Sequence, residues 1–98
     1  MATSGGAGQF DSAKWKAQQD STARNNPRAG MIGDLQQRVL QVGMTREQVV
    51  VLLGKPDTTE GNRYVYDIGT SAFGVDYEFF VVEFDGEGKL LRHSITRG

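Results

Sequence analysis

The spacing of hydrophobic residues divides the chain into a first half of helical pattern and a second half of strand pattern. From Met31 to Val42 the apolar residues recur about every three or four positions, which predicts a helix. Asp34 is a candidate N-cap, and Gly43 stands where a left-handed residue ends a helix. The apolar stripe of this helix consists of Met31, Leu35, Val39 and Leu40.

The clearest helix signal lies between Thr45 and Leu53. Thr45 and Gln48 match a capping box, in which the threonine hydroxyl accepts from the Gln48 N–H and the glutamine side chain accepts from the Thr45 N–H. Gly54 and Pro56 supply the left-handed residue and the residue that prevents continuation. A helix of about two turns is unstable alone, so its apolar stripe must pack on another element. That stripe is Val49, Leu52 and Leu53.

A further helical segment, from Asp11 to Arg24, precedes these two. It can be capped at Asp11, and Pro27 prevents its continuation because proline cannot donate to the helical ladder. Its apolar stripe is poor. We therefore expect Phe10 and Trp15 to hold this segment against the rest of the protein.

Alternating patterns predict three strands in the second half. They cover Arg63 to Ile68, Asp76 to Phe84 and Lys89 to Thr96, and glycine-containing turns join them. The first strand presents one apolar face, made of Tyr64, Tyr66 and Ile68.

Helices followed by strands indicate an α+β fold. We expect two short helices packed on a three-stranded antiparallel β-meander (α-α-β-β-β), with an extra N-terminal helical segment. The expected parts are a flexible lead-in or tether over residues 1–9, a helical extension over 10–26 and one domain over 31–97.

In the last strand Leu91 and Ile95 are expected to share a face with His93, while Leu90 faces the other way. The predicted core is Leu35, Val39, Leu40, Met44, Val49, Leu52, Leu53, Tyr66, Ile68, Phe80, Val82, Phe84, Leu91 and Ile95.

Composition and charge exclude several classes of function. Eleven Lys and Arg against twelve Asp and Glu give a net charge of −1. The chain therefore lacks the excess of positive charge that is typical of proteins that bind nucleic acid. The absence of cysteine and the single histidine exclude disulfides, thiolate metal sites and multi-histidine metal clusters within the chain. No apolar run is long enough to cross a membrane, and no signal peptide is visible. We expect no nucleic-acid partner, no metal and no cofactor.

The thirteen glycines are about twice the usual share, but their positions do not match a nucleotide site. Gly5, Gly6 and Gly8 precede no predicted strand–helix junction, so a dinucleotide-binding motif is excluded by context. Gly54-Lys55 lacks the other residues of a phosphate-binding loop. We interpret the glycines as residues of the flexible lead-in, the helix ends and the turns that join the strands.

The sequence contains little that supports a catalytic site. Glu78 and Glu83 face opposite sides of one strand, so they do not form a hydrolytic pair. His93 with a serine and a nearby acid is the remaining arrangement, and it lacks the Gly-x-Ser-x-Gly turn that exposes a nucleophile. We assign no catalytic residue and keep a small hydrolase using His93 as a remote alternative. The serines considered are Ser12, Ser71 and Ser94, and the acids of the strand half are Asp67, Asp76, Glu78, Glu83, Asp85 and Glu87.

One group of polar residues is the preferred candidate for a contact surface. These residues lie around the helix–strand junction and the first loop, but a solvated rim explains them better, so we do not assign them as site residues. They are Arg46, Lys55, Asp57 and Arg63.

The segment from Val42 to Asp57 resembles the SmpA/OmlA (BamE-like) lipoprotein domain family. That family's pattern is Gly-Met-Thr, a short helix with Val and Leu, and then Leu-Gly-x-Pro. This chain carries it as Gly43-Met44-Thr45 and Leu53-Gly54-Lys55-Pro56. Two strand segments, Tyr64–Asp67 and Val82–Leu90, extend the resemblance, which covers about residues 31–95.

The resemblance implies an α-α-β-β-β fold in a periplasmic lipoprotein that an acylated N-terminal cysteine tethers to the outer membrane. The best-known member is an accessory subunit of the machinery that inserts β-barrel proteins, and the same fold occurs in β-lactamase-inhibitor-like domains that bind proteins. This chain departs from the pattern because it has no lipobox cysteine and has an extra segment from Phe10 to Arg24.

We therefore expect a non-catalytic, lipoprotein-like module of the cell envelope that binds proteins or serves a structural role, accessory to outer-membrane assembly or integrity. Its expected location is the periplasm, associated with the outer membrane through an N-terminal lipid anchor missing from this chain. The alternative is a soluble inhibitor-like or sensor domain that binds a single protein partner. A homodimer is a further expectation, because Asp76–Phe84 or Lys89–Thr96 can pair across a two-fold axis.

Overall fold

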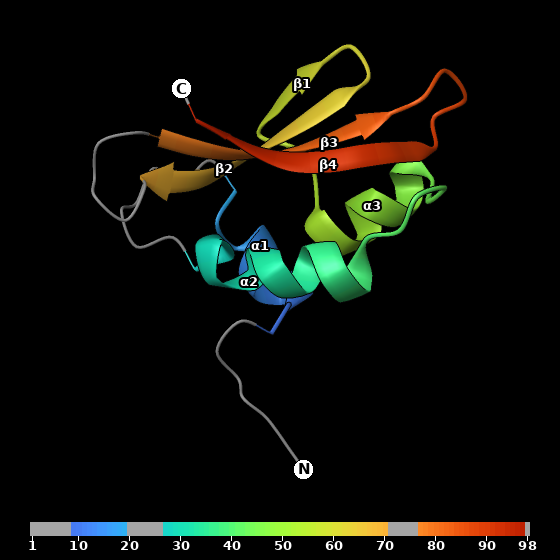
Figure 1. Ribbon diagram of the computed structural model, residues 1–98. Helices are drawn as coiled ribbons and strands as arrows, with labels where there is room; N and C mark the ends of the chain where they lie inside the picture. Colours follow the sequence, from blue (N-terminus) through green and yellow to red (C-terminus); the bar gives the residue numbers. More distant parts are fainter. Residues whose placement is uncertain (1–8, 20–26, 71–76, 98) are drawn as a thin grey trace.

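The computed structural model describes residues 9–19, 27–70 and 77–97 and has two layers (Figure 1). Helices cover one face of a four-stranded antiparallel sheet, which confirms the expected α+β class. The sheet has one strand more than the sequence predicted. Residues 1–8 of the expected lead-in, the end of the first helical segment and Asp76 lie outside the described residues.

The N-terminal element is shorter than expected but is anchored as predicted. Helix α1 (Ser12–Lys16) is capped by Asp11, whose side chain accepts from the Lys14 N–H at 3.1 Å. Trp15 is fully buried, and the Phe10 ring lies 6.2 Å from the Trp15 ring. The predicted continuation to Arg24 falls largely on residues whose structure is not described, after a turn at residues 17–19.

The second helix differs from the prediction at both ends. Helix α2 (Arg28–Asp34) begins directly after Pro27, which has the φ of −63° that a helix start requires. Asp34 is therefore the last residue of α2, and the prediction that it caps a helix is wrong. The chain continues in a π-helical segment, η1 (Leu35–Val39), which ends because Leu40 is extended. The helical run thus stops before Val42, and Gly43 (φ +97°) belongs to the following turn.

Helix α3 (Arg46–Leu53) confirms the capping box. The Gln48 N–H donates to the Thr45 hydroxyl at 3.1 Å, and the Thr45 N–H donates to Gln48 Oε1 at 2.9 Å. Gly54, with φ +78°, ends the helix as predicted. This positive φ places the position in the region that favours glycine.

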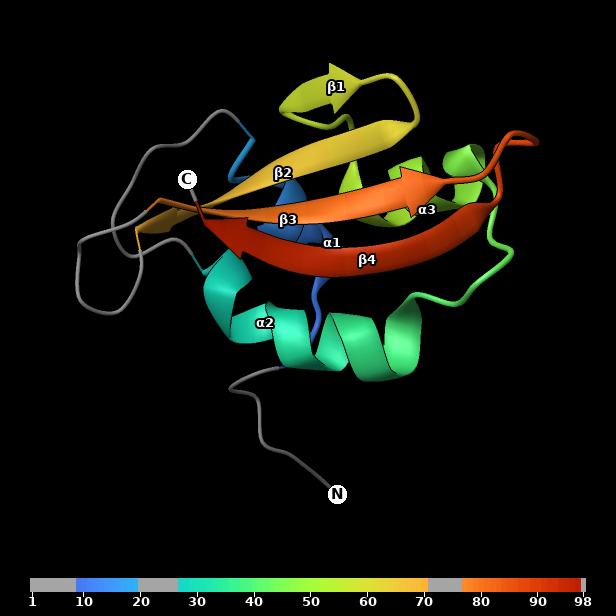
Figure 2. The ribbon, with the colours of Figure 1, turned by 45° about the horizontal axis from the view of Figure 1, so that its top comes forward.

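The sheet is a meander in the order β1-β2-β3-β4 (Figure 2). Its strands are β1 (Thr58–Glu60), β2 (Arg63–Thr70), β3 (Tyr77–Phe84) and β4 (Leu90–Arg97). The sequence analysis missed β1, because three polar residues show no alternation. The strand forms because the two-residue turn Gly61-Asn62 folds it back on β2, with Glu60 opposite Arg63.

A bulge in β4 reverses one prediction. Phe84 pairs with Leu90 and Glu83 pairs with Arg92, so Leu91 is an extra residue on β4. The extra residue changes which side chains share a face. Leu90 is 1% exposed and belongs to the core, whereas Leu91 is 42% exposed, so both assignments from simple alternation are wrong. Ile95 lies opposite the buried Phe80 but is 44% exposed, so its placement in the core is also wrong.

The core lies between the helices and the sheet. Most of its predicted members are buried there, while Val39, Met44 and Leu52 pack on it as partly buried residues. The additional buried apolar residues lie in the N-terminal segment, at the start of the second helix, on the open face of the sheet and at the bulge. They are Trp15, Met31, Ile32, Val65, Val81 and Leu90.

Candidate functional site

His93 does not stand in a catalytic arrangement among the described residues. It lies on β4 opposite Val82, with its ring 5.9 Å from the Phe80 ring. Desolvation by burial lowers the pKa of His93, which favours the neutral imidazole. Ser12 lies on α1, where its hydroxyl donates to the Leu52 carbonyl at 2.6 Å, and Ser94 is exposed on β4. Ser71 is outside the described residues.

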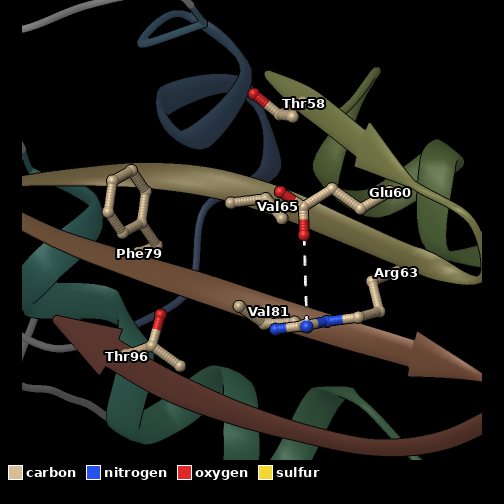
Figure 3. A pocket seen from close by; sticks show the side chains of 7 residues that line it. All are labelled: Thr58, Glu60, Arg63, Val65, Phe79, Val81 and Thr96. Atoms are coloured by element: carbon tan, nitrogen blue, oxygen red, sulfur yellow. Dashed lines mark ion pairs between the residues drawn. The ribbon is translucent and has the colours of Figure 1, made fainter. Parts of the chain in front are cut away.

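The face of the sheet opposite the helices holds a hollow of about 300 Å³ (Figure 3). Its floor is apolar, because Val65 and Val81 lie there with the partly buried Phe79. Threonines and charged residues form the rest of the lining. The polar lining residues are Thr58, Glu60, Arg63 and Thr96.

A row of alternating charges crosses the sheet beside this hollow. Arg63 on β2 lies 4.0 Å from Glu60 on β1 and 3.8 Å from Glu83 on β3. Glu83 lies 3.3 Å from Arg92 on β4. The row therefore runs from acid to base, acid and base as it passes from β1 to β4. Sequence reasoning missed it because the register of the strands depends on the turn at Gly61-Asn62 and on the bulge at Leu91.

Arg28, on α2, is a buried charged residue that sequence reasoning did not identify. Its side chain is fully buried, its Nε donates to the Trp15 carbonyl at 2.9 Å, and its Nη1 lies 2.8 Å from Asp57 Oδ2. The guanidinium also lies 4.9 Å from the centre of the Trp15 ring. Asp57 Oδ2 accepts from the Asp67 N–H at 2.8 Å. This cluster ties α1 and α2 to the turn after α3 and to β2, so its role is structural.

The structure separates the four residues expected to form a contact surface. The Asp57 side chain is 3% exposed and pairs with Arg28, so it is not available to a partner. Arg46 donates to Asn62 at 2.6 Å and lies over the Phe84 ring. Arg63 belongs to the charged row, and Lys55 is exposed after α3. Only the last three reach solvent, and they belong to different local environments.

The segment before α3 is hydrogen-bonded to the beginning of β4. The Gly43 N–H donates to the Leu90 carbonyl at 2.9 Å, and the Leu90 N–H donates to the Met44 carbonyl at 2.7 Å. Thr45 forms an isolated antiparallel bridge with Lys89. The Gly-Met-Thr sequence thus covers the first part of the β4 edge, in addition to supplying the cap of α3.

A second hollow, of about 290 Å³, lies on the outer side of α3 and is mainly apolar. Met44, Gln48, Val51 and Leu52 line it, and Val51 is largely exposed. In the described parts of the chain, no three His, Cys, Asp or Glu side chains are grouped so as to hold a metal ion. None of the helices seen there has the length and apolar character needed to cross a membrane.

The family model described as "Outer membrane protein assembly factor BamE domain" matches residues 34–93. The matched range holds η1, α3, β1, β2 and β3 in full and β4 as far as His93. It covers more than half of the 98 residues, so the chain belongs to this family. No curated protein matches the chain. Trp15 and Arg28 lie outside the matched range, whereas Asp57, to which Arg28 is bound, lies inside it.

Proposed function

We propose that this member of the BamE family is a non-catalytic, protein-binding module of the cell envelope, accessory to outer-membrane assembly or integrity. The observation that carries the proposal is the family match, which includes the capped helix α3 and nearly the whole sheet. The proposed location is the periplasm, in association with the outer membrane.

The geometry supports binding because the residues of the family pattern are used inside the fold. Thr45 caps α3, and Gly43 and Met44 bond to Leu90. The Gly54 carbonyl accepts from the Tyr66 hydroxyl at 2.9 Å. These groups hold the domain together, and surfaces of the domain remain accessible to a partner protein. The accessible surfaces include the open face of the sheet, the edge of β4 and the outer side of α3.

The proposal is tested by crosslinking in cells that contain the full chain in their envelope, followed by capture and mass spectrometry. We expect recovery of outer-membrane assembly proteins, and greater sensitivity to large antibiotics in cells that lack the protein. A control is a variant with Arg28→Met, which should destabilise the domain by removing the cation of the buried ion pair and should reduce capture.

Two other outcomes would contradict the proposal. Stoichiometric capture of one partner unrelated to outer-membrane assembly would favour the inhibitor-like or sensor alternative. If no partner is captured and the outer membrane stays intact in cells lacking the protein, both the envelope-module proposal and the inhibitor-like or sensor alternative are wrong.

A further inference from the structure

The edge of β4 is the longest strand edge that the described part of the chain leaves open. β1 and β4 are the two outer strands of the sheet, and β1 has only three residues against eight in β4 (Figure 2). Residues 43–45 cover the edge only at Lys89 and Leu90. An antiparallel edge strand directs the N–H and C=O groups of alternate residues away from the sheet, so the rest of β4 can pair with another strand.

The helix-facing side of β4 is incompletely covered. Phe80, Val82 and Phe84 on β3 are all buried on this side. Their partners on β4 become progressively more exposed along the strand: Leu90 is buried, His93 is half-buried and Ile95 is 44% exposed. A further strand beside β4 would place a side chain against Ile95 and continue the apolar layer.

The charges across the sheet end on cations at this edge. The row from Glu60 through Arg63 and Glu83 finishes at Arg92. At the other end of the strand, Arg97 on β4 pairs with Glu78 on β3 at 2.7 Å. Arg92 and Arg97 both keep 65% of their side-chain surface exposed. Since opposite charges on adjacent strands attract, the next strand would favour carboxylates at these two positions.

From this arrangement we propose that β4 accepts an extended, acidic segment of a partner protein as a fifth strand of the sheet. The inference rests on the proposed function as a protein-binding module and names the surface and the chemistry of the partner. The segment carries carboxylates that face Arg92 and Arg97, with an apolar residue between them that covers Ile95. Backbone hydrogen bonds supply the attraction, and the side chains supply the selectivity.

A second copy of the chain fits this edge poorly. Residues 90–97 contain three basic or imidazole side chains and no Asp or Glu, so no register of one β4 against another places a carboxylate beside Arg92 or Arg97. The opposite edge, β1, offers a single acid, Glu60, on a strand of three residues. The charge pattern therefore favours a different protein.

The test uses the full chain labelled for NMR and two synthetic peptides rich in valine and threonine. One peptide carries two glutamates at the spacing of Arg92 and Arg97, and the control carries lysines at those positions. We expect the glutamate peptide to shift the backbone amides of β4 from Leu91 onward and to protect the alternate amides that point away from β3, and the lysine peptide to have little effect. Equal effects of both peptides, shifts confined to the open face around Phe79, or self-association of the chain through β4 in light scattering would each overturn the inference.

A pair of variants separates the edge from the open face. Replacing Arg92 and Arg97 by Gln should weaken binding of the glutamate peptide by roughly three- to tenfold, since each removes one cross-strand attraction. The matched variant Arg63→Gln, on β2, should leave this binding nearly unchanged.

The same variants distinguish the two proposals in cells. If the double variant captures partners as well as the parent chain does, strand addition is wrong while the proposed function stands; if neither chain captures a partner, the proposed function itself fails.

Discussion

The two faces of the sheet bury neighbouring valines in different ways. Val81 and Val82 follow each other on β3 and are 2% and 0% exposed. Val82 lies under the helices in the apolar core, whereas Val81 lies on the open face among the residues that line the hollow. Similar burial therefore has two causes: a second layer of structure on one side, and side chains of the same sheet on the other.

Charged groups show the same contrast between the faces. Arg28 is fully enclosed on the helical side and has its partner, Asp57, at 2.8 Å. Arg63 on the open face keeps 45% of its side-chain surface exposed and lies 3.8–4.0 Å from its acids. A buried ion pair becomes very costly when one partner is removed, while an exposed one contributes little. The faces should therefore respond very differently to equivalent substitutions.

The largest effect is expected from Arg28→Met, which leaves the Asp57 carboxylate buried without its cation. The free energy of unfolding should fall by about 3–5 kcal/mol. The equivalent change on the open face, Arg63→Met, should cost less than about 1 kcal/mol. Urea unfolding of both variants measures the difference, and a comparable loss at both positions would contradict the distinction between the two faces.

Helix α3 provides the next test, through two adjacent leucines. Leu53 is fully buried, so Leu53→Ala should cost about 2–5 kcal/mol. Leu52 is only partly buried at the rim of the core, so Leu52→Ala should cost clearly less. Thermal and urea unfolding check the order of the two. A loss of under about 1 kcal/mol at both would show that α3 does not pack on the sheet.

The neighbouring valines of β3 should give a smaller difference in the same direction. Val82→Ala should cost about 2 kcal/mol, because the helices and the sheet hold the resulting cavity open. Val81→Ala should cost about 1 kcal/mol, because side chains on the open face can move into the space. Equal losses in urea unfolding would mean that the open face is packed as rigidly as the core.

The smallest effect is expected at Asp34, where α2 meets the N-terminal segment. Hydrogen bonds from Arg38 and from the Phe10 N–H lower the pKa of Asp34 from 3.8 to about 2. A carboxyl with a lowered folded-state pKa stabilises the fold above its unfolded pKa and loses this contribution as the pH falls. Asp34→Asn should therefore flatten the decline in stability between about pH 4 and pH 2, as urea unfolding across that range would show. An unchanged decline would mean that the bonds to Arg38 and Phe10 do not persist in solution.

Local signals predicted most of the fold, and long-range geometry accounts for the errors. The cap at Thr45, the end at Gly54, the apolar face of β2 and the predicted core residues of β3 depend on residues close in sequence, and the structure confirms them. The position of Leu90 depends on one extra residue in a strand pair, which period-two alternation does not reveal.

The candidate surfaces were less predictable for the same reason. Exposure at the helix–strand junction was expected for Asp57, but its partner Arg28 lies 29 positions earlier, and no local pattern indicates that pairing. The charged row from Glu60 to Arg92 depends on the registers of three strand pairs. Residue types alone gave the correct charges but not their order across the sheet.

The hydrogen bonds from Gly43 and Met44 to Leu90 also constrain the order in which the domain is completed. They join the start of α3 to the last strand of the described fold, across nearly half of the chain. Contacts between residues so far apart slow folding, because the intervening loop must close before the contact forms. Helix α3 cannot be fully stabilised by these contacts until the β3–β4 hairpin has been synthesised. A chain interrupted near Phe84 would leave both the helix start and the last core positions without their partners, and would expose apolar surface at that stage.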